Sequence, residues 1–200
     1  KERDAGNISS AEYDEKHSAA ENALKESRGV PFVRAIGMFR EPDSAVFFVA
    51  SLVIAMAMAV YFAFAALFLE QGAKVKPENI GPVMTLGQWV EIFFLFTLTL
   101  FIQWWGYNTV LVIGMIAWAL RFAIFAAQPP FAIIAIGVAP HGICFDFFFA
   151  AGMMYTNEIA PEGIKNSAQS LYGVLVYGIG MWLGSEAAGW LNHALTREWG

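Results

Sequence analysis

Charged side chains are scarce in most of this 200-residue chain, and the few that lie inside its long apolar stretches are the first candidates for chemistry. An ionised side chain at the centre of a lipid bilayer costs about 2.5–3.5 kcal/mol on insertion scales, so each one needs a partner or a function. The sequence contains five ionisable residues in such positions: Glu91, Arg121, His141, Asp146 and Glu186.

Gln88 and Glu91 form the first candidate pair. They lie three residues apart, so on a helix they project from one face. An amide both donates and accepts hydrogen bonds, whereas a carboxyl group accepts them or carries a proton. The pair therefore suits a ligand rich in hydroxyl groups or ring nitrogens. The alternative is a hydrogen bond that joins this helix to its neighbour.

His141, Phe145 and Asp146 form the second candidate group. Their spacing keeps them on roughly one side of a helix, which Pro140 and Gly142 are expected to bend. Apolar residues surround Asp146, and this desolvation would let its carboxyl group exchange a proton near neutral pH. Phe145 is the ring expected to stack on a planar ligand. His141 is either a ligand contact or a hydrogen-bonded packing residue.

Arg121 offers a competing interpretation of Asp146, because an ion pair between the two would hold the carboxylate ionised and inert. Arg121 is otherwise expected to be structural, either pairing with a carboxylate or extending towards the membrane interface. Glu186 lies near the end of its apolar segment and is expected to be hydrated. No second histidine lies at membrane depth and the single cysteine, Cys144, has no partner, so neither a metal nor another cofactor is expected.

The composition indicates which elements position these groups. The chain is 58% hydrophobic, and residues 1–43 hold 7 of its 12 basic and 9 of its 17 acidic residues. The remaining residues are too poor in charge to cover the surface of a soluble domain, so lipid is expected to surround them. The sequence also has no basic stripe that would bind nucleic acid.

The apolar stretches predict an all-α integral membrane protein with five spanning helices. The first of these contains no charged residue and is long enough to cross about 30 Å of hydrocarbon. Breaks are expected at Trp105-Gly106 and at Pro140, and Ser167 is expected to cap the last span. The five predicted spans are residues 45–69, 83–104, 109–127, 131–155 and 168–190.

Three regions follow from this pattern: a linker arm at 1–43 with an amphipathic segment at the membrane surface, a transmembrane region at 44–191 and a truncated tail at 192–200. Lys and Arg counts place the arm on the cytoplasmic side. Five spans leave the last helix on the side opposite the arm. Because transporter halves are commonly built from six helices, the chain is expected to be a fragment that lacks one helix.

Four segments of the sequence resemble a known group of transporters. They are similar to the C-terminal half of major facilitator superfamily transporters, and most similar to the bacterial nucleoside:proton symporter family. The resemblance covers about residues 45–191. The segments are GQWVEIFF (87–94), GMIAWALRFAIFA (114–126), HGICFDFFFAAG (141–152) and IKNSAQSLYGVL (164–175).

This resemblance implies which residues form the site. Family substrate contacts fall on Gln88, Glu91, Phe145 and Asp146, with His141 in place of a tyrosine that some members carry. Proton coupling would fall on Asp146 or Glu91. The first span departs from the nucleoside-binding pattern. Members that bind nucleosides carry polar amides there, whereas the stretch AMAVYFAFAALF has only a tyrosine as its polar group.

The function implied is proton-coupled symport of a nucleoside, or a related small polar metabolite, across a bacterial inner membrane. Its partners would be the substrate, protons, membrane lipid and an N-terminal six-helix half of the same protein. Two alternatives stay open. One is an intramembrane enzyme that uses Glu91, His141 and Asp146 as acid, base or metal ligands. The other is a non-transporting sensor on the same fold.

Overall fold

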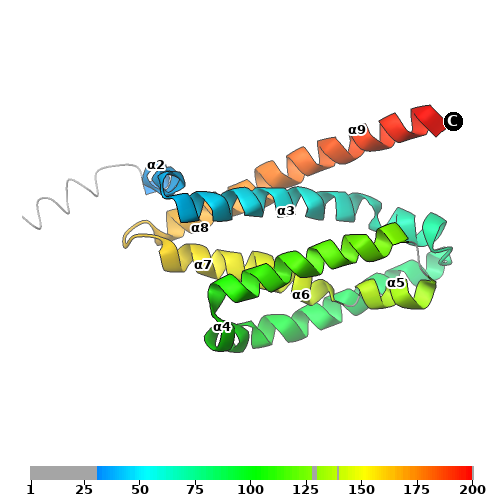
Figure 1. Ribbon diagram of the computed structural model, residues 1–200, viewed down its shortest axis with the longest axis horizontal. Coiled ribbons are helices and arrows are strands. Elements are labelled where there is room, and N and C mark those ends of the chain that lie inside the picture. The colour runs from blue at the N-terminus through cyan, green and yellow to red at the C-terminus, as the bar shows by residue number, and fades with distance from the viewer. Residues whose placement is uncertain (1–30, 128–129, 139, 200) are drawn as a thin grey trace, which may run out of the picture.

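The computed structural model describes residues 31–127, 130–138 and 140–199, which form a bundle of helices that run along its long axis (Figure 1). Most of the predicted linker arm, residues 1–30, lies outside the described residues. Within the described part every regular element is helical, which confirms the predicted all-α fold.

The elements follow one another along the chain with short connections. Three of them, η2, η3 and η4, are π-helical turns, and η1 is a 3-10 turn. The bounds are α2 Pro31–Ile36, η1 Gly37–Arg40, α3 Pro42–Leu67, η2 Phe68–Gly72, α4 Pro77–Ala127, α5 Phe131–Val138, α6 His141–Phe145, η3 Asp146–Ala150, α7 Ala151–Ile159, α8 Lys165–Gly173, η4 Val174–Gly180 and α9 Met181–Trp199.

Each predicted span falls on helical backbone in the structure. Two helical segments, Pro42–Gly72 and Pro77–Ala127, are long and apolar enough to cross a membrane. The second contains two of the predicted spans, joined at Gly106. The other two spans are built from shorter helices, α5 to α7 and α8 to α9.

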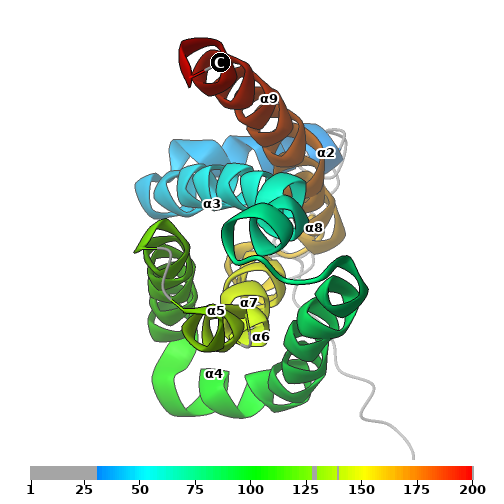
Figure 2. The ribbon, with the colours of Figure 1, turned by 90° about the vertical axis from the view of Figure 1, so that its right-hand side faces the viewer.

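Gly106 produces the sharp reversal inside α4. Its backbone has φ 76° and ψ 161°, a region that only glycine adopts without strain. The predicted break at Trp105-Gly106 is therefore confirmed. Seen end-on, α6 and α7 lie between the two halves of α4 (Figure 2).

Replacing Gly106 with alanine is expected to lower stability through the backbone alone. An added Cβ would meet no atom within 4 Å, so the cost of about 1–3 kcal/mol comes from the forced conformation. Thermal unfolding of the detergent-solubilised protein measures this. Gly189→Ala is the matched control, because Gly189 also has open space around its Cα but lies in α9. Equal unfolding temperatures for the two variants would contradict the assignment.

The predicted bend at Pro140 is also confirmed. Helix α5 ends at Val138, and Pro140 precedes the first residue of α6. A π-helical turn then begins at Asp146. Such turns insert one extra residue into a helix and are frequent at functional sites.

One boundary prediction is wrong. Ser167 does not cap the last span, because α8 already begins at Lys165, directly after a turn in which Gly163 has a φ of 83°. Helix α9 runs to Trp199, so it includes residues of the segment expected to be a truncated tail, and the division of the chain at 192–200 stays a prediction. The segment at 31–40 is helical, as the amphipathic pattern suggested, and its place at a membrane surface stays a prediction.

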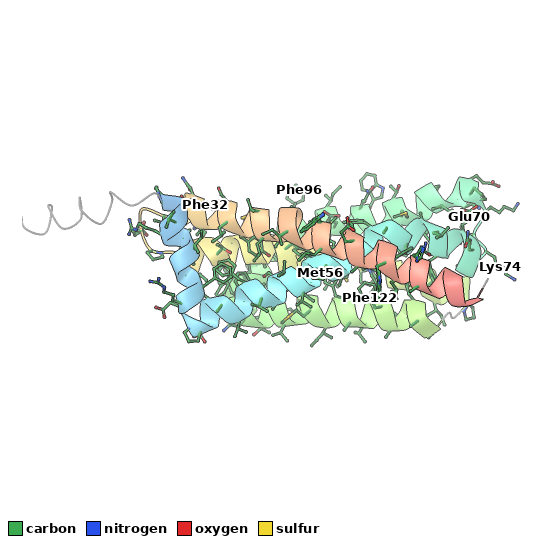
Figure 3. The ribbon with its side chains drawn as sticks, turned by 90° about the horizontal axis from the view of Figure 1, so that it is seen from above. Phe32, Met56, Glu70, Lys74, Phe96 and Phe122 are labelled. Atoms are coloured by element: carbon green, nitrogen blue, oxygen red, sulfur yellow. The ribbon has the colours of Figure 1, made fainter. Side chains whose placement is uncertain are left out.

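Small residues hold the last span against the first: Gly180 and Gly184 have the GxxxG spacing that is typical of close helix contacts. A Cβ on Gly180 would lie 2.5 Å from the Cβ of Ala55, and one on Gly184 would lie 2.5 Å from the carbonyl oxygen of Met56. Figure 3 shows Met56 where α3 and α9 cross. This contact fixes one wall of the bundle and leaves α4 and α6 to form the other.

Candidate functional site

A second glycine contact brings the two groups of candidate residues together. Gly142 of α6 packs directly on the backbone of α4, so that an added Cβ would lie 2.6 Å from the Cα of Glu91. One turn earlier on α4, Gly87 faces His141 in the same way, and an added Cβ there would lie 2.9 Å from the histidine Cβ. Glu91 and His141 therefore lie side by side although they are fifty residues apart in sequence.

The side chains of Glu91 and His141 meet at the edge of the described bundle. Oε2 of Glu91 lies 3.7 Å from Nε2 of His141, and the two side chains are 28% and 11% exposed. This distance is slightly beyond a direct hydrogen bond, so a small movement or a ligand atom can complete the contact. The carboxylate can accept a hydrogen bond from a ligand while remaining within reach of the imidazole.

Arg121 lies behind the histidine and points into the bundle. It is 2% exposed and donates to three acceptors: Nη1 to Nδ1 of His141 at 2.9 Å, Nη2 to the carbonyl oxygen of Val138 at 3.1 Å and Nε to that of Gly137 at 3.3 Å. The predicted extension to the membrane interface is therefore wrong. Among the described residues it makes no ion pair with a carboxylate, so its structural role rests on hydrogen bonds at the break between α5 and α6.

Asp146 lies one helical turn beyond His141 and is fully enclosed. It is 1% exposed, and its Oδ2 has no hydrogen-bond partner among the described residues. The described residues contain no ion pair between Asp146 and Arg121, so the competing interpretation from the sequence is not supported. Asp146 follows Gly142, which packs on the backbone of Glu91, by four residues. A buried carboxylate without a partner is costly, which favours a bound proton or ligand at this position.

The other predicted residues lie around this centre or outside it. Phe145 is half-buried, and its ring centroid is 5.9 Å from that of His141 in a stacked arrangement. Gln88 is exposed one turn before Glu91 on α4. Glu186 is exposed on α9, as its predicted hydration requires, and does not join the cluster.

Sequence reasoning missed two tyrosines at the site. Tyr61 of α3 is buried, with its ring stacked at 5.8 Å from His141 and 4.7 Å from the guanidinium carbon of Arg121. Tyr177 of η4 is 47% exposed, and its ring centroid lies 6.3 Å from that of Phe149, one turn beyond Phe145. The available signal was a tyrosine within an apolar run, which does not reveal the direction of its side chain.

The fold defines the class of the protein. The described residues superpose on a crystal structure of a mutant of the nucleoside transporter NupG with a TM-score of 0.69, at 25% identity, over 77% of this chain and 41% of that one. The chain therefore has the all-α fold of a major facilitator transporter.

The sequence places it in a family. The profile of the nucleoside H+ symporter family matches residues 15–199, and the chain belongs to that family. It is 29% identical to the xanthosine permease of Escherichia coli (strain K12) over 78% of this chain and 40% of the relative. It is 25% identical to the nucleoside permease NupG of the same organism over 82% and 42%.

These matches favour one of the three functions that the sequence left open. The family consists of membrane transporters rather than enzymes, so the intramembrane enzyme is not supported, and neither is the sensor. The chain spans about 40% of the length of the curated relatives that it matches.

Proposed function

We propose that the protein is a proton-coupled nucleoside symporter of a bacterial inner membrane. The observation that carries this proposal is the carboxyl group of Asp146, which is 1% exposed and whose Oδ2 has no hydrogen-bond partner among the described residues. Burial without a partner disfavours the ionised form of a carboxyl group, so Asp146 is suited to carrying a proton. Transfer of that proton across the membrane is what a symporter couples to substrate movement.

The ligand is held by the face that Gln88, Glu91 and Phe145 form. The amide and the carboxylate hydrogen-bond its polar groups, and the half-buried phenyl ring stacks on its base. Asp146 or Glu91 carries the coupling proton. Tyr177 of the last span, whose ring centroid lies 6.3 Å from that of Phe149, adds an exposed hydroxyl group on this side of the bundle.

Lipid and a second helical half complete the protein. The outer face of α4 presents large apolar side chains: Trp89 is 68% exposed, Phe93 60% and Phe96 82%. Phe96 lies on the outer edge in Figure 3. Such a face requires hydrocarbon or another apolar surface. We assign residues 1–43 to a cytoplasmic linker arm and 44–191 to the transmembrane half that docks against an N-terminal six-helix half.

Transport in proteoliposomes tests this proposal. The protein expressed from its complete reading frame is reconstituted, an inward proton gradient is imposed, and labelled nucleoside inside the vesicles is counted. We expect accumulation above the external concentration, abolished by a protonophore and reduced by unlabelled nucleosides. The proposal would be contradicted if internal nucleoside only reached the external concentration, or if uptake did not depend on the proton gradient.

Phe145→Leu is expected to weaken nucleoside binding by about tenfold, because a leucine fills the space but loses the stacking contact, worth about 0.5–1.5 kcal/mol. The dissociation constant of the purified protein for nucleoside measures this loss. Phe96→Leu on the outer face of α4 is the matched control and should leave binding unchanged. Equal affinities for both variants would remove Phe145 from the site.

A further inference from the structure

The contacts of Arg121 bear on a question that the proposed transport function leaves unanswered, namely what His141 presents to the ligand. The guanidinium carbon of Arg121 lies 4.7 Å from the ring centroid of Tyr61 and 5.4 Å from that of Trp118. Two aromatic faces and three acceptors thus enclose a group that cannot turn without losing several contacts. Such a group can impose an orientation on its neighbour.

The chemistry of arginine fixes which atom of the imidazole carries the proton. A guanidinium group is always charged, and its nitrogen atoms only donate. The contact of 2.9 Å between Nη1 of Arg121 and Nδ1 of His141 therefore requires Nδ1 to accept. A neutral imidazole has one donor and one acceptor nitrogen, so its hydrogen is on Nε2. A protonated imidazole would place an N–H and a second positive charge against the guanidinium.

The remaining groups around the ring agree with this assignment. Nε2 is the nitrogen that faces Glu91, at 3.7 Å from Oε2. Tyr61 and Phe145 present ring faces at centroid distances of 5.8 and 5.9 Å, which hold the plane of the imidazole. The ring is thus oriented with its donor towards the exposed edge and its acceptor towards the buried arginine.

We propose that Arg121 is a positioning residue of the ligand site: it locks His141 in the tautomer that presents an Nε2–H donor beside the Glu91 carboxylate. The site then offers a donor next to an acceptor. It selects a ligand edge on which a hydrogen-bond acceptor adjoins an N–H or O–H group. The identity of the ligand in this inference rests on the proposed function. The tautomer of His141 is independent of that function.

Two amide substitutions separate ligand contact from packing. The side-chain amide of His141→Gln reaches the position of Nε2, and that of His141→Asn reaches the position of Nδ1. If Nε2–H serves the ligand, both variants bind nucleoside more weakly than the native protein. The glutamine variant should still bind about tenfold more tightly than the asparagine variant, because it keeps one hydrogen bond. If His141 only satisfies Arg121, the asparagine variant binds at least as well, which would overturn the proposal.

Nitrogen-15 spectra of labelled histidine report the tautomer directly in the complete protein. His141 is assigned by the signal that disappears in His141→Gln, and we expect its protonated nitrogen to be Nε2 in the absence of ligand. Protonation at Nδ1 would overturn the inference without any variant of Arg121. In Arg121→Met, checked for folding by its unfolding temperature, the tautomers should become mixed, and an unchanged spectrum would also refute the role.

A double-variant cycle completes the test. Arg121→Met should weaken nucleoside binding less in the His141→Gln background than in the native one, since glutamine has no tautomer to lock. Equal losses in both backgrounds would assign Arg121 a purely structural role. A native protein that binds no nucleoside would refute the proposed function instead, and the spectra would still decide the tautomer.

Discussion

Asp146→Asn is expected to abolish the accumulation of nucleoside against its gradient while preserving exchange of nucleoside across the membrane. Asparagine has the shape of a protonated aspartic acid but cannot release a proton. Asp146 is 1% exposed, and its Oδ2 has no partner among the described residues, so the neutral amide removes an unfavourable buried charge. The variant can therefore still exchange nucleoside, because those steps of the transport cycle keep the proton bound. It cannot complete the steps in which the proton is released.

Two uptake measurements in proteoliposomes distinguish these steps. Accumulation driven by a proton gradient should fall to the level seen without a gradient, whereas exchange of labelled for unlabelled nucleoside should persist. Asp43→Asn is the matched control, because Asp43 is an exposed carboxylate in the first turn of α3. Unchanged accumulation in Asp146→Asn would remove the coupling role from this residue.

Gly142→Ala is expected to destabilise the protein and to disturb the site at once. The added Cβ would lie 2.6 Å from the Cα of Glu91, 2.7 Å from its nitrogen and 2.7 Å from the carbonyl oxygen of Val90. All three are backbone atoms of α4, so the two helices must separate. Overpacking of this kind costs about 1–3 kcal/mol. The same separation moves Glu91 away from His141 and should weaken nucleoside binding.

Gly173→Ala is the control for this variant. Gly173 closes α8, and an added Cβ there would meet nothing within 4 Å. Its unfolding temperature and its affinity for nucleoside should match those of the native protein. If Gly142→Ala behaves in the same way, α4 and α6 do not pack as closely as described.

Local features of the sequence were sufficient to predict most of the fold. Apolar runs marked the helices, and Gly106 and Pro140 marked the two sharp changes of direction, since each has a backbone constraint of its own. The spacing of Gly180 and Gly184 is likewise typical of a close helix contact, and the structure contains one there. The prediction that Ser167 caps the last span was wrong because the helix begins two residues earlier, at Lys165, directly after the turn at Gly163.

The partners at the site depended on packing between helices that no single segment encodes. Arg121 was expected to meet a carboxylate or the interface, yet it bonds His141 and two carbonyl groups exposed by the break after α5. These carbonyl groups belong to the last two residues of α5, where the helix ends before Pro140. The burial of Tyr61 against the same guanidinium also depends on how α3 crosses α4. The roles of the site residues themselves stay predictions.

Movement of protons with nucleoside is the most direct test of the central claim. Proteoliposomes that contain the complete protein and a trapped pH indicator are given nucleoside without any imposed gradient. We expect the interior to acidify as nucleoside enters, and Asp146→Asn to abolish the acidification. Entry of nucleoside with no change of internal pH in the native protein would contradict proton coupling at this site.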